Sequence, residues 1–255
     1  MRVHKGRQDA VSSVLPAPFF NRWTVQPTRQ LVGISRTPVL TVDEIGPEPA
    51  AIIAMAQALG PFPYAANNYP GLRRIIGPAD NAAWTYVTSL LKDAASFIGG
   101  AFDVDGFDLV EASFSLVTTR PQALTPVQRL PHFDSVDEDL IALLHYAAPC
   151  AGTAFYRHIA TGLELVTPDN VDRFVAIARR DAQSAGPRYV YPREHGAFEP
   201  IGHVEGRAGR LVAYPGRLLH SGVIPQGFDF SDDPASGRLT TNIFLKTRLN
   251  AGARA

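Results

Sequence analysis

The stretch Leu130–Ala147, LPHFDSVDEDLIALLHYA, changes from polar and acidic to apolar along its length. Its first half places His132 and Asp134 two positions apart, just before an apolar run that is typical of a buried strand. Side chains of an extended backbone alternate between its two faces, so residues two apart lie on the same side. The imidazole and the carboxylate are therefore candidate ligands for a single metal ion.

From residue 107 onward the chain is rich in short runs of Val, Leu, Thr and aromatic residues bounded by Gly and Pro, which predicts strands. One helix is predicted near 168–184, with Thr167 as its cap and Pro168 at its first position. The predicted strands are FDLVEASFSLVTT (107–119), LIALLHYA (140–147), GTAFYRH (152–158), GRLVAYP (209–215) and GRLTTNIFLKTRL (237–249).

Residues 1–106 are predicted to form loops and helices. The stretches 41–60 and 78–100 carry helix start and stop signals, the second ending at Gly99 and Gly100, and a Pro-rich loop (61–74) separates them. Helices followed by strands favour an α+β, mainly β fold in which a sandwich or barrel carries the site. Because no linker divides the sequence, we expect a single domain, 1–255, with the N-terminal helices packed on the barrel.

The composition excludes several classes of function. Lys plus Arg and Asp plus Glu both number 24, so the net charge of zero gives no electrostatic reason to expect nucleic acid or an anionic membrane as a partner. Cys150 is the only cysteine, which excludes an intramolecular disulfide and a thiolate zinc site. No long apolar run suggests a signal peptide or a membrane helix, so the expected location is the cytoplasm.

A third metal ligand is needed, because one His-x-Asp pair arises easily by chance. His220 ends the apolar run that begins at Gly209, and the two His and one carboxylate would then form the facial triad of non-haem Fe(II) enzymes. Further on, Arg238 shares one strand face with Thr240 and Asn242. The rival pair, His203 and Glu205, lies too close to His220 to leave room for the strands between ligands that a barrel needs.

Together, His132-x-Asp134, His220 and Arg238-x-Thr240 resemble the Fe(II)/2-oxoglutarate-dependent dioxygenase superfamily, and GTAF (152–155) is similar to a strand motif of its prolyl-4-hydroxylase-like branch. The resemblance implies a double-stranded β-helix, a cupin-like jelly-roll barrel with flanking N-terminal helices, over 107–249. It differs from the usual pattern in spacing, because Arg238 follows His220 only after SGVIPQGFDFSDDPASG (221–237), which must then be a long loop between two strands.

The resemblance also implies roles for these residues. His132, Asp134 and His220 would hold Fe(II), while Arg238 and Thr240 would bind the far carboxylate of 2-oxoglutarate. With O2, the enzyme would oxidise, and most simply hydroxylate, a C–H bond of a small-molecule or amino-acid-like substrate, releasing succinate and CO2. The carboxylate of Asp134 indicates hydroxylation or a related oxidation rather than halogenation.

The sequence also offers other candidate site residues and other candidate functions. Tyr69, Arg73, Arg129 and Arg157 are candidates for substrate contact, although NNYPGLRR (67–74) also fits a plain Pro-Gly turn. Of the remaining histidines, His145 is predicted in the core, and His158 and His195 on the surface. The alternative functions are a cupin-type metalloenzyme without 2-oxoglutarate and a non-catalytic jelly-roll binding module. The sequence does not determine the oligomeric state, and a homodimer is one candidate.

Overall fold

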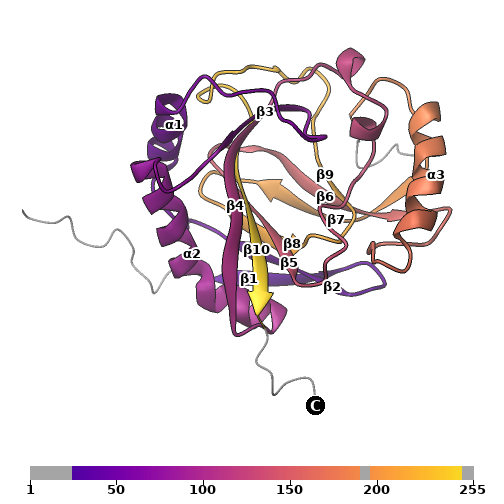
Figure 1. The fold of residues 1–255 in the computed structure, drawn as a ribbon, viewed down its shortest axis with the longest axis horizontal. Coiled ribbons are helices and arrows are strands. Elements are labelled where there is room, and N and C mark those ends of the chain that lie inside the picture. Colours follow the sequence, from indigo (N-terminus) through magenta and orange to yellow (C-terminus); the bar gives the residue numbers. More distant parts are fainter. Residues whose placement is uncertain (1–24, 190–195, 249–255) are drawn as a thin grey trace, which may run out of the picture.

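The computed structural model describes residues 25–189 and 196–248, and its strands form two antiparallel sheets (Figure 1). The larger sheet has seven strands in the spatial order β1 (Pro27–Val32), β2 (Thr37–Val42), β8 (Leu211–Pro215), β5 (Leu140–Tyr146), β10 (Leu239–Arg248), β4 (Gly106–Val117) and β3 (Gly71–Ile75). The smaller sheet has three strands in the order β7 (Phe198–Gly206), β6 (Cys150–His158) and β9 (His220–Gly222).

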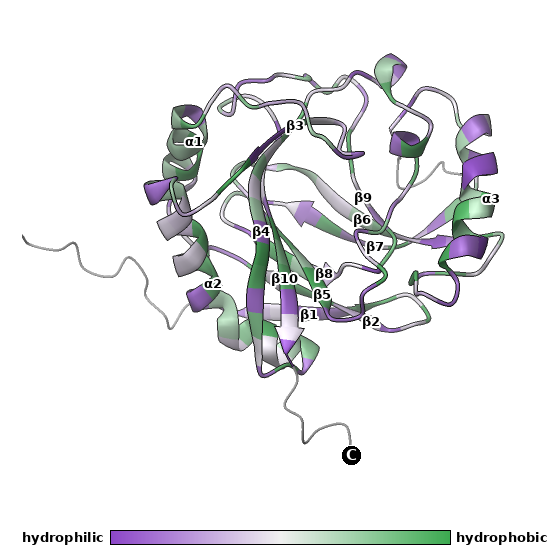
Figure 2. Cartoon of the chain, viewed as in Figure 1, coloured by the Kyte–Doolittle hydropathy of each residue, from purple (hydrophilic) through white to green (hydrophobic). Residues whose placement is uncertain are grey.

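Strand β5 lies near the middle of the larger sheet and is covered on both faces. Ile141 and Leu143 belong to the core beneath the helices, whereas Ala142 and Tyr146 belong to the core between the sheets. A strand buried on both sides has no solvent-facing positions, which explains why its sequence is apolar without alternation. Figure 2 shows the same concentration of hydrophobic residues on β5 and β8.

The helices α1 (Pro49–Ala58) and α2 (Asn81–Phe102) cover the outer face of the larger sheet (Figure 1). Val87, Leu90 and Ile98 of α2 are fully or almost fully buried at helical spacing against that face. Burying such aliphatic side chains stabilises the fold by about 1.5–3 kcal/mol each. Within the part of the chain that is described, the structure contains no helix long and apolar enough to cross a membrane.

The helix α3 (Val171–Ser184) covers the outer face of the smaller sheet, on the opposite side of the molecule from α1 and α2 (Figure 1). Phe174 of α3 packs with Tyr156 and Phe198 in one apolar cluster. His158 of β6 lies between the rings of Phe174 and Phe198 and contacts Asp181 of α3 at 2.9 Å. Ring contacts and a hydrogen bond thus attach the helix to the sheet.

The two sheets pack face to face over a third cluster, which includes Tyr146 and Tyr214 from the larger sheet and Phe155 and Val204 from the smaller. Among the described residues, no strand ladder joins the two sheets, so a closed barrel is not observed. The observed architecture is a mixed α and β fold with antiparallel sheets. The space between the two sheets contains the site described below.

Some sequence predictions are confirmed and others are wrong. The five predicted strands correspond to β4, β5, β6, β8 and β10, and the three predicted helices are present. The prediction of only loops and helices before residue 107 is wrong, because β1, β2 and β3 belong to the larger sheet. Helix α2 continues through Gly99 and Gly100 to a left-handed Asp103, and α3 begins after Asn170 rather than after Thr167.

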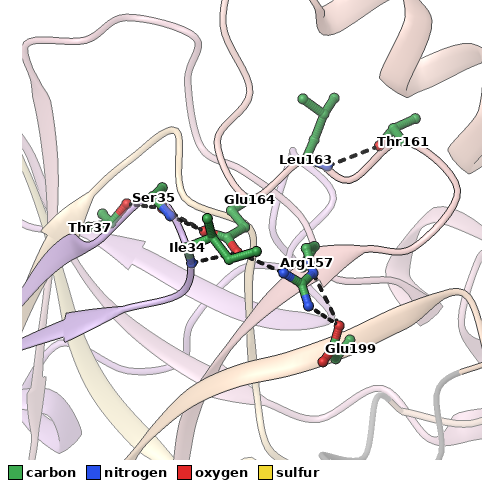
Figure 3. A network of polar contacts seen from close by, with 8 residues as sticks. All are labelled: Ile34, Ser35, Thr37, Arg157, Thr161, Leu163, Glu164 and Glu199. Atoms are coloured by element: carbon green, nitrogen blue, oxygen red, sulfur yellow. Dashed lines mark hydrogen bonds and ion pairs between the residues drawn. The ribbon is translucent and has the colours of Figure 1, made fainter.

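A polar network attaches the turn between β1 and β2 to the loop that follows β6 (Figure 3). Glu164, whose side chain is 4% exposed, accepts hydrogen bonds from the backbone N–H groups of Ile34 (3.0 Å) and Ser35 (2.9 Å) and from the Ser35 hydroxyl (2.6 Å). Arg157 lies between Glu164 and Glu199 on the outer side of this junction. This network fixes the edge of the larger sheet against the smaller one.

Candidate metal centre

Backbone hydrogen bonds bring the three predicted metal ligands together. His132 and His220 form an isolated antiparallel bridge, in which each N–H donates to the other residue's carbonyl at 2.9 and 2.8 Å. The Asp134 N–H donates to the carbonyl of Gly216 at 2.7 Å, so the next ligand is attached to the same segment. The loop that carries His132 and Asp134 is therefore aligned beside strand β9, although the two segments are far apart in the sequence.

The ligand atoms of His132, Asp134 and His220 all lie within 4.8 Å of one another. The Asp134 carboxylate is 3.5 Å from Nε2 of His220 and 3.9 Å from Nε2 of His132. These three residues are the one group of three or more His, Cys, Asp or Glu in the described ranges whose ligand atoms converge in this way. Two imidazoles and one carboxylate match the donor set of a facial-triad iron site.

The protonation of His220 suits a metal ligand. Its Nδ1 lies 2.8 Å from the carbonyl of Leu218, which can only accept a hydrogen bond, so the proton lies on Nδ1 and the Nε2 lone pair is free. Burial lowers the pKa of His220 to about 4, so the ring is neutral at pH 7. Neutral imidazole is the form that binds metal.

The charges of the other two ligands are coupled. Burial, together with the nearby His220, lowers the pKa of His132, although 53% exposure of its ring weakens this effect. Burial raises the pKa of Asp134 to about 6 in spite of the opposing charges of His132 and Arg73. At pH 7 the group thus contains neutral imidazoles and one carboxylate, whose negative charge a cation would neutralise.

The three ligands line a cavity of about 300 Å³ between the sheets. Apolar side chains from both sides form much of its wall, including Phe133, Val117, Leu144, Ile224 and Phe244. Asn67, Asn68 and Gln128 add polar groups from loops. A cavity with apolar walls and convergent polar and charged groups is typical of a small-molecule site.

Arg238 is the buried cation of this cavity. The long segment after β9 connects two strands, as the spacing between His220 and Arg238 requires. It places Arg238 at the start of β10, directly over Gly222, which is two residues from His220. A Cβ atom at Gly222 would lie 3.3 Å from Nη2 of Arg238, so this glycine makes room for the guanidinium. Arg238 donates to the Gly152 carbonyl at 3.1 Å, while its buried Nε has no hydrogen-bond partner among the described residues.

The other predicted contact residues divide into two groups. Tyr69 and Arg73 line the cavity. Thr240 is fully buried and does not line it; its hydroxyl donates to Asn242 at 2.7 Å, which leaves the predicted hydrogen bond to a co-substrate without support in the geometry. Arg129 donates to the carbonyls of Leu124 and Ala185, and Arg157 belongs to the outer network in Figure 3, so neither reaches the cavity.

The remaining histidines are accounted for outside the site. His145 is fully buried, as predicted, with Nε2 donating to the Ile45 carbonyl (2.9 Å) and Nδ1 2.6 Å from the Tyr86 hydroxyl. The prediction that His158 is exposed is wrong, because its side chain is 0% exposed behind α3. His203 is exposed on β7 and contacts the Ala151 carbonyl, and His195 lies outside the described residues.

Sequence reasoning missed several groups at the site. Tyr214 packs its ring 4.7 Å from that of His220, and the Leu218 carbonyl orients the same imidazole. Gly222 had a usable signal, because a glycine inside a strand indicates a close approach by another group. The roles of Tyr214 and Leu218 depend on pairing between distant segments, for which the sequence gives no local sign.

Comparison with protein families identifies the family of this chain. The model of a family of unknown function, DUF6445, matches residues 24–245. The chain belongs to this family. No curated protein matches the chain significantly in sequence.

Comparison with solved structures gives the fold. The α-ketoglutarate-dependent epimerase SnoN from nogalamycin biosynthesis aligns with a TM-score of 0.51 at 12% identity, covering 86% of this chain and 84% of that one. HygX from Streptomyces hygroscopicus, with nickel and 2-oxoglutarate bound, aligns with a TM-score of 0.50 at 11% identity, covering 82% and 83%. At these identities the comparisons establish a similar fold; the chemistry must be argued from this chain's own residues.

Proposed function

We propose that this DUF6445 protein is an Fe(II)/2-oxoglutarate-dependent oxygenase that oxidises, and most simply hydroxylates, a C–H bond of a small molecule. The observation that carries the proposal is the convergence of two imidazoles and one carboxylate within 4.8 Å in the wall of a cavity that Arg238 also lines. The two sheets would be the halves of a double-stranded β-helix, the fold that carries this chemistry in the resembling superfamily.

The residues present fit the metal. The donor set suits Fe(II), the Nε2 lone pair of His220 is free, and Asp134 supplies the one negative charge. Bound iron and 2-oxoglutarate would supply the oxidising chemistry with O2, leaving succinate and CO2 as products. His132, Asp134 and His220 would hold the metal, and the Leu218 carbonyl would keep the Nδ1 proton of His220 in place.

Arg238 fits the far carboxylate of the co-substrate. It lies over Gly222, two residues beyond His220 on β9, so a ligand that extended from the metal along this strand would approach the guanidinium. Its buried, unpartnered Nε offers a donor, and a charged hydrogen bond of this kind is worth about 1.5–3 kcal/mol. The apolar wall formed by Val117, Ile224 and Phe244 would exclude water and contact the substrate.

The test is to add Fe(II) to the protein without oxygen, titrate 2-oxoglutarate, and record the visible spectrum. Chelation of the iron by the keto acid gives a weak, broad charge-transfer band. We expect the band in the wild-type protein, its loss in His220→Ala, and its retention in the control His203→Ala, whose ring is exposed on β7. Iron binding without a band contradicts the co-substrate and favours a different metalloenzyme. No iron binding contradicts the whole proposal.

A further inference from the structure

The cavity contains a second arginine besides the one assigned to the co-substrate. Arg73 lies on β3, at the far edge of the larger sheet, and its side chain is 11% exposed. In the sheet register Arg73 is opposite Ser115 of β4, and Ser115 is opposite Thr240 of β10. Directly opposed residues share a face. Thr240 is in turn opposite Tyr146 of β5, whose ring packs between the sheets, so Arg73 is on the face toward that space. Its neighbour Arg74 is on the helix side and pairs with Asp80.

The guanidinium of Arg73 is fixed in place but not fully used. Its Nη2 forms an ion pair with Glu111 (2.7 Å) and donates to the Ser113 hydroxyl (2.8 Å), both on β4. Its Nε is buried and has no hydrogen-bond partner within residues 25–189 and 196–248. A buried N–H group without a partner costs about 1–3 kcal/mol, so such groups mark places where a ligand or water binds.

A second unused donor lies in the same wall. The Tyr69 hydroxyl is buried close to Thr240 and to the charges of Arg238 and Arg73, but makes no hydrogen bond of normal geometry in the described part of the chain. Tyr69 and Arg73 both line the cavity, and the turn at Pro70 and Gly71 connects them. Gly71 is required there because a Cβ atom would lie 2.0 Å from the Leu116 carbonyl oxygen, so the turn is pressed against β4.

These two donors suit the two oxygens of one carboxylate. The Nε–H of Arg73 and the hydroxyl of Tyr69 can each donate one hydrogen bond to an anion. Neither side chain carries a negative charge at pH 7, so the pair does not suit a cation. Arg238 is assigned to the co-substrate because it lies over Gly222, two residues from His220, so Arg73 is the arginine left for a second carboxylate. Apolar walls next to the donors would hold the body of the same molecule.

We propose that Tyr69 and Arg73 bind the carboxylate of the substrate, so that the substrate is a small organic acid with an apolar body. This inference rests on the proposed function for the identity of the site. It adds that the protein selects its substrate by charge, and that one arginine serves the co-substrate while the other serves the substrate. Glu111 and Ser113 are then positioning residues that hold the guanidinium against β4.

The experiment uses a panel of carboxylates, each paired with its neutral primary amide: acetate, benzoate, 4-phenylbutyrate and indole-3-acetate. Binding is measured by the shift in melting temperature and by calorimetry, on full-length protein loaded with Fe(II) and 2-oxoglutarate under nitrogen and also on metal-free protein. We expect at least one carboxylate to bind about tenfold more tightly than its amide. If every amide binds as well as its acid, the inference is overturned.

Variants assign the effect to Arg73. Arg73→Gln should remove the preference for the acid, and Arg73→Lys should restore part of it because the charge returns. Arg74→Gln is the matched control, since it removes the neighbouring charge from the opposite face of β3 and should keep the preference. An unchanged preference in Arg73→Gln overturns the inference, as does a preference lost in Arg74→Gln.

A 2-oxoglutarate titration separates this inference from the proposed function. Arg73→Gln should retain the wild-type dissociation constant for 2-oxoglutarate within about twofold, while Arg238→Gln should raise it about tenfold or more. If Arg73→Gln instead abolishes 2-oxoglutarate binding, Arg73 is the co-substrate anchor and the inference fails while the proposed function stands. If no protein binds Fe(II) or 2-oxoglutarate, the proposed function fails, and the acid-over-amide result on metal-free protein still decides the role of Arg73.

Discussion

His132 and His220 are paired through their backbones before any metal is considered. Each N–H donates to the other residue's carbonyl, at 2.9 and 2.8 Å, and their rings lie 4.3 Å apart between centroids. The hydrogen bonds involve main-chain atoms, so they hold the two ligands together whatever the side chains are. The folded protein therefore carries a preorganised site, and metal binding need not draw two distant segments together.

The first prediction concerns this preorganisation. His132→Ala should leave the melting temperature of the metal-free protein almost unchanged, because the backbone pair does not use the imidazole. It should remove the stabilisation by added Fe(II), which for the wild type is about 2.7 kcal/mol at a free metal concentration one hundred times the dissociation constant. Thermal unfolding under nitrogen with and without Fe(II) measures both. A variant that unfolds much earlier without metal would show that the ring itself supports the fold.

The second prediction concerns the space beneath Arg238. Gly222→Ala places a methyl group 3.3 Å from Nη2 of Arg238 and should displace the guanidinium. Overpacking of this size costs about 1 kcal/mol, which corresponds to about fivefold weaker binding of 2-oxoglutarate. Titration of the visible band measures the change. Gly100→Ala in α2 is the control, because a methyl group there meets no atom within 4 Å and should leave binding unaltered.

The third prediction concerns Glu164 and acid. Burial by itself raises the pKa of this carboxyl, but hydrogen bonds from Ser35 and Ile34 and the charge of Arg157 outweigh it and lower the pKa below 4.5. Because the pKa of Glu164 is lower in the folded protein than in the unfolded chain, its ionised form stabilises the fold. This stability is complete above the pKa of the unfolded chain and is lost as the pH falls through the pKa of the folded protein. Glu164→Gln should thus cost about 1–3 kcal/mol at pH 7.

Urea unfolding of wild type and Glu164→Gln at several pH values checks this sign. The difference in the free energy of unfolding should be full at pH 7 and should shrink once the pH falls below about 4.5, the ordinary value for Glu. Glu199→Gln is a suitable control, because that partner of Arg157 is 49% exposed and should matter little. A gap that widens toward low pH would contradict the assignment.

The fourth prediction concerns His145. Burial lowers its pKa to about 4, from an ordinary value of 6.5, despite the hydrogen bond to the Ile45 carbonyl. The unfolded chain therefore takes up a proton between pH 6.5 and pH 4 that the folded protein refuses, and stability falls as the pH decreases through this window, by about 3 kcal/mol in total. Stability contributed by neutral His145 is complete above pH 6.5 and absent below pH 4.

Comparison with His145→Gln isolates this contribution. The variant should be less stable at pH 7, because the hydrogen bond to Tyr86 at Nδ1 is lost, and its free energy of unfolding should depend less on pH between 6.5 and 4. His203→Ala serves as the control, because that ring is exposed and its removal should leave the pH dependence as in the wild type. Equal slopes for wild type and His145→Gln would refute the prediction.

What the sequence determined by itself is the set of local patterns. Apolar runs ended by Gly and Pro located β5, β6 and β10, helical spacing located α2, and the two-residue interval between His132 and Asp134 located the first two ligands. These signals depend on residues that are close along the chain, where side-chain alternation and helical periodicity follow directly from backbone geometry.

Only the tertiary structure decided which distant segments meet. The strands β1 and β3 carry ordinary surface-like sequences and become strands because the edges of a larger sheet satisfy their hydrogen bonds. In the same way, the bridge between His132 and His220, and the placement of Arg73 and Arg238 in one cavity, arise from pairing across long loops. Such pairing depends on the whole hydrogen-bond and packing arrangement, so no local pattern encodes it.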